Sequence, residues 1–498
     1  MQFVSLEFLV FVALSLCAFH LAPSLRARRA VLMMSNVAFA AFLVSSPWSM
    51  APMALFLAGS FGLIRLVHAR RARGVLAAAL VGTIGAFIVL KQYIPAAALF
   101  PTLAQPYSVI GLSYVLFRVL HVQIDCHEGA LAEPPSARAF LAYCCFFPAW
   151  LSGPIQRYED YRAQEDAIDR VDLSADEIHD ALSRIVTGVF KIAVLSGVLL
   201  DAHQRLAGVR LETASPPHFA AVLAAAAAFY TLYMYVNFAG YMDVAIGVAR
   251  LYGFHLPENF DHPFAAGSML DFWTRWHITL SAWFRTYLFN PLLRALTRRW
   301  GSGTSGPYLG VVAYLVTFWV MGLWHGSTPI FVLYGSFLGI TASGNKLWEI
   351  EARRMLGKDR FRRLRASEAY GALCRGAVFA VFSAALVCFW VTPRLRLALG
   401  GAPLLASLAL LVLMLAAAVL LALGAWLHAR LDAIQAGLLR VRDRMLAHPA
   451  AAPDESPLRA ARRRRWGRQV ALGVKTYAVL MLLLLRWTAV PTFVYVPF

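Results

Sequence analysis

Long apolar runs recur along the whole chain, and they limit what it can fold into more than any other feature. About 20 mostly apolar residues are enough for a helix to cross the hydrocarbon core of a membrane. Of the 498 residues, 60% are hydrophobic and 15% are charged, whereas an ordinary soluble domain has about 25% charged residues. A water-soluble globular enzyme and a disordered chain are therefore both excluded.

We predict an all-α, polytopic integral membrane protein with about 10–12 transmembrane helices. The apolar runs that could span are residues 3–22, 30–46, 50–67, 75–98, 107–122, 138–152, 181–200, 217–236, 307–324, 328–345, 373–392, 402–427 and 470–490. No small-residue cleavage site follows the first run, so we expect a retained span rather than a signal peptide. The absence of a composition shift typical of a soluble domain predicts one membrane domain over residues 1–498.

Basic residues outnumber acidic ones and give a net charge of +19. In a soluble protein this charge would suggest nucleic-acid binding, but in a membrane protein it is typical of cytoplasmic loops, so we expect no nucleic-acid partner. The positive-inside rule places 25–29, 68–74, 353–365 and the basic loop 429–468 in the cytoplasm, with both chain ends outside. The six cysteines form no CxxC pair and no metal-ligand spacing, so no metal site is expected.

The segment 271–291 (DFWTRWHITLSAWFRTYLFNP) is too polar for a lipid-facing span and too rich in Trp and Phe for a solvated loop. A re-entrant or interfacial element that is buried in protein reconciles these two properties. His277 and Ser281 lie four residues apart, so we expect them to share one face of a helix, which Arg285 continues.

His325 ends an apolar run in the segment 318–330 (FWVMGLWHGSTPI). Burying a histidine in or near hydrocarbon costs free energy unless the ring has a partner. A neutral imidazole can accept a proton from a hydroxyl group, and Gly326 would let a ligand or the backbone approach closely. His325 is therefore either a functional histidine or a packing residue with a satisfied ring.

Taken together, WTRWHITLSAWFRTYLFNP and GLWHG resemble the membrane-bound O-acyltransferase family. The resemblance is to its bacterial branch, which contains alginate O-acetyltransferase and the D-alanyl transfer protein of teichoic acid D-alanylation. Three further stretches agree with that branch in order: FFPAWLSGPIQRYEDY (146–161), GVFKIAVLSGVLLD (188–201) and YVNFAGYMDVAIGVARLYGFHLPENFDHPF (235–264). The motifs define a family-like core over residues 90–345.

Two positions depart from the pattern of this branch. Thr286 stands between Arg285 and Tyr287, where the family often has Arg-Asp-Tyr, and Leu338 precedes Gly339, where many members have His-Gly. These departures leave the acceptor and any role of a third histidine open.

The resemblance implies helices arranged around a central tunnel and an acyltransferase activity. The family's invariant histidine corresponds to His325, the general base for the acceptor hydroxyl, and the second histidine corresponds to His277, which either lines the same tunnel or has a structural hydrogen-bonding role. The expected substrate-binding residues are Trp324, Gly326, Trp276, Arg275, Ser281, Asp243 and Asn259. Asp243 could instead serve only to pair with Arg250 or Lys191.

The implied reaction moves a short acyl group, acetyl in preference to D-alanyl, from a cytoplasmic thioester to an extracytoplasmic hydroxyl. The donor would be acetyl-CoA or an acyl carrier protein, with no bound cofactor. The acceptor would be a cell-surface polysaccharide, a teichoic acid-like polymer or an intermediate partner protein. Such a protein is expected in the cytoplasmic (inner) membrane of a bacterium.

The C-terminal tail, residues 491–498, resembles a Phe-x-Tyr-x-x-Phe ending found in many bacterial members. The hydroxyl of Tyr495 would either carry the acyl group covalently or belong to a ring that anchors the tail at the membrane interface.

A transporter or flippase is the main alternative to an acyltransferase. That class predicts inverted repeats, which are not evident in the sequence. A structural scaffold would leave the polar, aromatic segment 271–291 unexplained.

Overall fold

The computed structural model is almost entirely α-helical over the residues that it describes. These are 5–43, 47–91, 93, 111–168, 171–209, 215–301, 303, 306–326 and 328–390, followed by short stretches between 409 and 482. Within these residues the single β-type feature is an isolated antiparallel bridge between Phe260 and Trp276.

The main helices are α1 (Leu6–Leu21), α2 (Leu25–Leu43), α3 (Ala51–Arg70), α4 (Arg73–Leu90), α6 (Leu112–Glu128), α7 (Ala137–Cys144), α8 (Phe147–Trp150), α9 (Tyr158–Asp166), α10 (Ala175–Phe190), α11 (Ser196–Ala207), α12 (Pro216–Leu251), α13 (Met269–Phe272), α14 (Ile278–Phe284), α15 (Asn290–Trp300), α16 (Gly306–His325), α17 (Pro329–Ala366) and α18 (Glu368–Leu386). Two π-helical turns continue helices without a break, η4 (Lys191–Leu195) between α10 and α11 and η6 (Arg285–Phe289) between α14 and α15.

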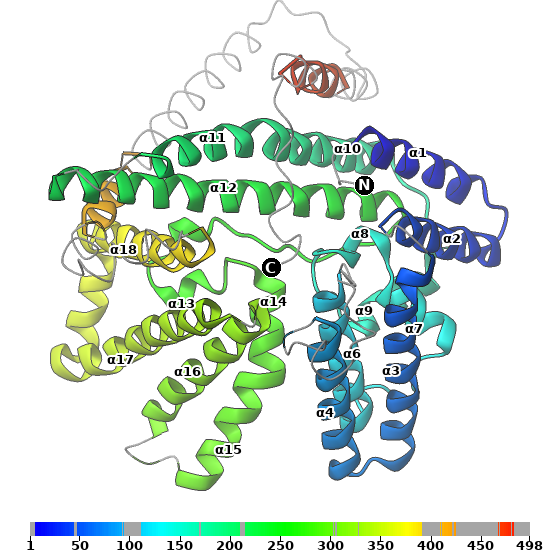
Figure 1. Ribbon diagram of the computed structural model, residues 1–498, viewed down its shortest axis with the longest axis horizontal. Helices are drawn as coiled ribbons and strands as arrows, with labels where there is room; N and C mark the ends of the chain where they lie inside the picture. Colours follow the sequence, from blue (N-terminus) through cyan, green and yellow to red (C-terminus); the bar gives the residue numbers. More distant parts are fainter. Residues whose placement is uncertain are drawn as a thin grey trace, which may run out of the picture.

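The long helix α12 organises the arrangement. It runs across the width of the molecule with α10 and α11 alongside, while α3, α4 and α6 form one group on its other side and α15, α16 and α17 form a second (Figure 1). The short helices α13 and α14 lie between α12 and the second group (Figure 1). Motif segments that are far apart in sequence are thereby brought to the middle of the molecule.

Glycines allow α10 and α12 to pack at very short distance. A Cβ atom on Gly188 would lie 2.6 Å from the Gly240 carbonyl oxygen, and one on Gly240 would lie 2.9 Å from the Gly188 carbonyl oxygen. Small residues at helix crossings are typical of membrane proteins, in which close backbone approach increases van der Waals contact.

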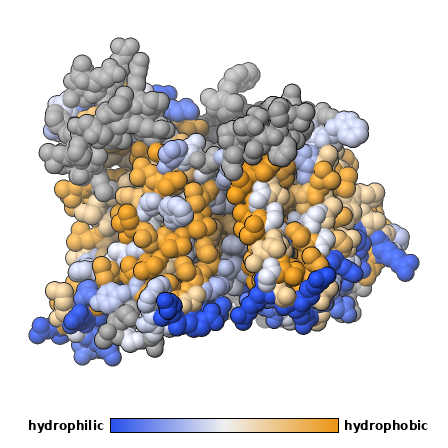
Figure 2. All heavy atoms as spheres, turned by 60° about the horizontal axis from the view of Figure 1, so that its bottom comes forward, coloured by the Kyte–Doolittle hydropathy of each residue, from blue (hydrophilic) through white to orange (hydrophobic). Residues whose placement is uncertain are grey.

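Six helices in the described part of the chain are long and apolar enough to cross a membrane. They are Trp48–Arg70, Arg73–Leu90, Ala175–Ala207, Pro217–Leu251, Gly306–His325 and Glu368–Phe389. Leu55 and Val81 on two of them are 73% and 71% exposed, as expected for side chains that face lipid. Hydrophobic residues cover the middle of the molecular face in Figure 2, and hydrophilic residues border it along one edge. The all-α, polytopic membrane class is confirmed.

The predicted span over 138–152 is wrong. The chain forms two short helices there, α7 and α8, whose residues are mostly buried against the rest of the protein. Pro148 lacks a backbone N–H and cannot continue a helix from α7, so the apolar run is split into pieces too short to span. The predicted spans 402–427 and 470–490 lie largely outside the described residues.

Candidate functional site

His277 occupies a tight turn immediately before α14. The Asp261 N–H donates to the Arg275 carbonyl oxygen (2.9 Å) and the Ile278 N–H donates to the Asn259 carbonyl oxygen (3.0 Å), so the turn is held on both sides. His277 itself has φ 45°, in the left-handed region that non-glycine residues rarely adopt. This backbone conformation is strained, so it persists only because the surrounding structure stabilises it.

The prediction that His277 and Ser281 share a helical face is wrong. His277 precedes the first helical residue of α14, and the Ser281 hydroxyl donates to the Trp276 carbonyl oxygen at 3.3 Å. The left-handed turn therefore directs the two side chains differently from a continuous helix.

The hydrogen bonds around His277 define its tautomer. Asn259 Oδ1 accepts from the backbone N–H of Thr279 (3.1 Å) and from its hydroxyl (2.9 Å), which identifies this Asn259 atom as the oxygen. His277 Nδ1 lies 3.2 Å from the same oxygen and must donate to it. Burial, assisted by the nearby His325, lowers the pKa of His277 to about 3, so the ring is neutral and its Nε2 is an acceptor. The Tyr114 hydroxyl, 3.2 Å away, therefore donates to Nε2.

Tyr114 connects His277 with the end of α16. Its ring lies parallel to His277, with centroids 6.3 Å apart, and meets Trp324 edge-on at 6.2 Å. The Trp324 carbonyl oxygen accepts a hydrogen bond of 2.6 Å from the Tyr93 hydroxyl. Helix α6, the His277 turn and the end of α16 therefore meet at one place.

His325 lies at this junction inside a set of aromatic rings. Its ring centroid is 4.7 Å from that of Trp324, 5.4 Å from Tyr334 and 5.9 Å from Phe389. His325 is half-buried, whereas His277 is only 1% exposed. His325 is therefore the more accessible of the two histidines.

Glycines in α16 and α17 determine where His325 lies. A Cβ atom on Gly335 would lie 2.8 Å from the Gly322 Cα atom and 2.7 Å from the Phe318 carbonyl oxygen, so the two helices pack backbone to backbone. A Cβ atom on Gly326 would overlap the Phe331 ring. Gly326 thus allows the Phe331 ring to pack closely against the backbone after His325.

Of the other predicted substrate-binding residues, Trp276 and Arg275 make structural contacts. Trp276 is 4% exposed, and its ring stacks on Phe272 with centroids 5.6 Å apart. Arg275 pairs with Asp271 (2.9 Å) and with Asp261 (3.5 Å), the two carboxylates that flank the turn. Both residues hold the His277 turn in place.

Asp243 lies on α12 in an ion-pair network. It accepts from Lys191 (2.7 Å), one of the two partners considered from the sequence, and from Arg184 (3.1 Å), which sequence reasoning missed. Arg184 also binds the Glu258 carboxylate. Asp243 is therefore paired with cations from α10 and η4.

Tyr495, the tail 491–498 and nearly all of the loop 429–468 lie outside the described residues. The sequence predictions about them stay predictions.

A cavity next to α14, with several charged and polar residues in its lining, was not predicted. Its volume is about 220 Å³, and it is lined by His121, Ile155, Gln156, Arg157, Asp160, Pro257, Glu258, Ile278, Thr279, Ala282, Trp283, Thr286 and Tyr287. Gln156 is 3% exposed, and its Nε2 atom has no hydrogen-bond partner among the described residues. Thr279 belongs both to this cavity and to the hydrogen bonds around His277, so the cavity adjoins the site.

Asp125 provides a carboxylate that contacts Tyr287, the residue that follows Thr286, where the chain departs from the family pattern. The Tyr287 hydroxyl donates to both Asp125 oxygens, at 3.0 and 3.1 Å. Burial raises the pKa of Asp125 to about 6, an effect that the Tyr287 hydrogen bond opposes. The sequence signal for this role was available, because α6 carries Asp125 among several other polar residues that interrupt its apolar positions, including Arg118 and Gln123.

These observations define an all-helical membrane protein with two histidines from distant segments at a shared buried site. Residues 78–349, more than half of the chain, match the family model described as MBOAT, the membrane-bound O-acyltransferase family. The chain belongs to this family, and the resemblance inferred from its motifs is confirmed.

Curated relatives come from both expected groups. The chain is 31% identical over 270 residues to the teichoic acid D-alanyltransferase of Streptococcus thermophilus, covering 51% of this chain and 60% of the relative. It is 29% identical over 231 residues to the probable alginate O-acetylase AlgI of Pseudomonas putida, covering 46% and 44%. The similarity therefore covers less than two thirds of the length of each relative.

Proposed function

We propose that this protein is a membrane O-acyltransferase whose general base is His325. The main supporting observation is that His325 is half-buried, with its ring among aromatic rings, and that the neutral His277 near it is engaged at both nitrogens. Membership of the O-acyltransferase family supports the reaction class. The location that we propose is the cytoplasmic membrane of a bacterium.

The chemistry follows from the states of the two histidines. His325 accepts the proton of the acceptor hydroxyl, whose oxygen attacks the carbonyl carbon of the donor thioester. The C–S bond breaks, an ester forms, and the leaving thiolate takes up the proton. His277 already donates through Nδ1 and accepts through Nε2, so it serves as a positioning residue that acts through Tyr114.

We propose acetyl as the transferred group and an extracytoplasmic polysaccharide, reached directly or through a partner protein, as the acceptor. The donor is a cytoplasmic thioester, acetyl-CoA or an acyl carrier protein. D-alanyl transfer is the competing specificity, because the relatives include a teichoic acid D-alanyltransferase as well as a probable alginate O-acetylase.

Replacing His325 tests the proposal. In the bacterium that encodes this protein, His325→Ala is expected to slow the transfer of acyl groups to the envelope polysaccharide by about 10²–10⁴-fold, because the general base is lost. Mass spectrometry of base-released acyl groups measures both their amount and their identity. His218→Ala is the matched control, since His218 is exposed in the first turn of α12 and is not one of the site residues. Acylation at the wild-type rate in His325→Ala membranes that contain normal amounts of the protein would contradict the assignment.

Replacing Tyr495 tests whether the tail carries the acyl group. Tyr495→Phe keeps the ring and removes only the hydroxyl, so an anchoring role tolerates it whereas a covalent role does not. We expect an inactive protein, together with an acyl adduct on the wild-type C-terminal peptide after incubation with donor. A fully active Tyr495→Phe protein would assign the tail to anchoring. The acyl group would then pass directly from donor to acceptor at His325.

A further inference from the structure

Helix α17 changes direction at Gly357 and folds its basic end around one aromatic ring. Gly357 has φ 75° and ψ 161°, which interrupts the helix. Phe361, four residues later, is only 4% exposed. The guanidinium groups of Arg353, before the break, and Arg365, after it, lie 5.5 and 5.9 Å from the centre of its ring.

A hollow of about 480 Å³ opens at this place, and we call it the cationic hollow. It is lined by Arg353, Lys358, Phe361, Arg362 and Arg365. Of the four cations, Arg362 alone has a carboxylate within 4 Å among the described residues, Asp359 at 3.0 Å. The positive-inside rule explains why this segment is basic, but it does not require the charges to converge on one hollow, where they repel one another.

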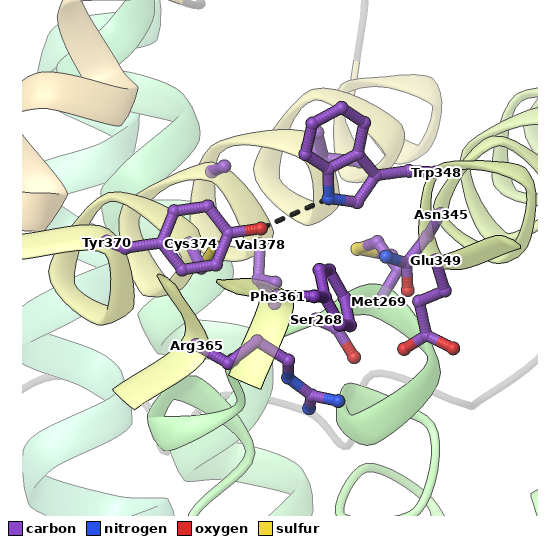
Figure 3. A pocket seen from close by; sticks show the side chains of 13 residues that line it. Ser268, Met269, Asn345, Trp348, Glu349, Phe361, Arg365, Tyr370, Cys374 and Val378 are labelled. Atoms are coloured by element: carbon purple, nitrogen blue, oxygen red, sulfur yellow. Dashed lines mark hydrogen bonds between the residues drawn. The ribbon is translucent and has the colours of Figure 1, made fainter. Parts of the chain in front are cut away.

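A second hollow of about 210 Å³ adjoins the first and shares Phe361 and Arg365 with it. It lies between α13, α17 and α18 (Figure 3). The Trp348 indole N–H donates to the Tyr370 hydroxyl at 3.1 Å, and both side chains lie above Arg365 in the view of Figure 3. Glu349 is the single carboxylate among the residues that line it.

The second hollow is lined in part by the segment that leads into the functional site. Ser268 and Met269 line it at the start of α13, and the Leu270 N–H donates to Asn345 Oδ1 of α17 at 3.1 Å. The chain continues from α13 directly into the turn that holds His277.

We propose that the two hollows form one binding site for a phosphate-bearing ligand. Its phosphate groups occupy the cationic hollow, where guanidinium groups offer paired donors and charge, and its less polar portion lies beside Phe361, Met269 and Trp348. The choice of ligand rests on the proposed function, because a thioester donor such as a CoA ester carries phosphate groups together with a less polar portion. The headgroup of an anionic lipid offers the same phosphate chemistry.

Binding of CoA to the full-length protein in a neutral detergent tests the site by isothermal titration calorimetry. The double variant Arg353→Gln/Arg365→Gln is expected to weaken binding by about tenfold or more, since it removes two charge-assisted contacts. Arg360→Gln/Arg363→Gln is the matched control, because it removes the same charge from the same segment at positions that do not line the cationic hollow. It should change binding less than twofold. The charge-retaining variant Arg353→Lys/Arg365→Lys is expected to bind CoA more tightly than Arg353→Gln/Arg365→Gln and to keep most of the wild-type affinity.

The lipid source is tested with nanodiscs that contain either phosphatidylcholine alone or added phosphatidylglycerol, and native mass spectrometry counts the retained lipid. If CoA does not bind, and Arg353→Gln/Arg365→Gln but not Arg360→Gln/Arg363→Gln retains less phosphatidylglycerol, the site binds a lipid headgroup. Equal losses in the two Gln double variants, or no binding of either probe, would overturn the proposal. His325→Ala should keep wild-type binding, so failure of the proposed reaction and failure of this site are distinguishable.

Discussion

At the scale of single residues, the site depends on a histidine in an unusual conformation. The left-handed φ of His277 is maintained by backbone hydrogen bonds on both sides of the turn and by Asn259. These contacts leave Nε2 directed at Tyr114. The role of His277 is therefore to orient its neighbours, whereas His325 is the more exposed of the two histidines.

This division of roles makes a prediction for Tyr114. Tyr114→Phe keeps the ring that packs between His277 and Trp324 but leaves the buried His277 Nε2 without this donor, at a cost of about 1–3 kcal/mol. We expect acyl transfer to fall about tenfold while the amount of folded protein is unchanged. Initial transfer rates, normalised to protein in the membrane, measure this. Tyr308→Phe, which removes a hydroxyl that donates to Glu351, is the control. A wild-type rate of acyl transfer in Tyr114→Phe would show that the Tyr114 hydroxyl does not position the site.

At the scale of helices, close glycine contacts determine the positions of the site residues. The α16–α17 crossing at Gly322 and Gly335 places the end of α16 against Phe331 and Tyr334. The α10–α12 crossing similarly brings Lys191 to Asp243. A larger side chain at either crossing would separate the helices and displace these pairs.

Two glycines of α17 provide a matched test of this argument. Gly335→Ala is expected to destabilise the protein by about 1–3 kcal/mol through overpacking, because its Cβ atom would lie 2.7 Å from the Phe318 carbonyl oxygen. Gly344→Ala should be neutral or slightly stabilising, since a Cβ atom there has no neighbour within 4 Å among the described residues. Thermal unfolding in detergent, followed by size-exclusion chromatography, compares them. Similar midpoints for the two variants would show that the crossing tolerates a methyl group.

At the scale of the whole molecule, the orientation in the membrane decides which side each substrate approaches from. The basic clusters predict that the α3–α4 connection and the end of α17 face the cytoplasm. The cationic hollow would then face the cytoplasmic donor pool, in agreement with a phosphate-bearing donor.

Cysteine labelling in intact cells tests this orientation. In a variant without the six native cysteines, Arg71→Cys and Arg360→Cys are expected to resist a membrane-impermeant maleimide until the cells are opened. Ser5→Cys, near the N-terminus that the charge pattern places outside, should react in intact cells. Labelling of Arg360→Cys from outside would show that the predicted orientation is wrong and that the cationic hollow does not face the cytoplasm.

The sequence alone determined the class of the fold and the family, because both depend on local information. Apolar runs of membrane-spanning length require helices, and short ordered motifs around His277 and His325 identify the family without reference to their contacts. The same local reasoning failed at 138–152, where Pro148 divides an apolar run, and at His277, where a left-handed turn replaces a continuous helix.

Which side chains meet depends on the tertiary structure. Tyr114 and His277 are separated by 163 positions in the chain, and Arg184 and Asp243 by 59. Such pairs depend on how closely helices approach one another, which the glycines at their crossings allow but which no local pattern encodes. Likewise, the cationic hollow exists because Gly357 bends α17 so that arginines on both sides of the break lie over Phe361. The sequence shows their charges, and the fold brings them together.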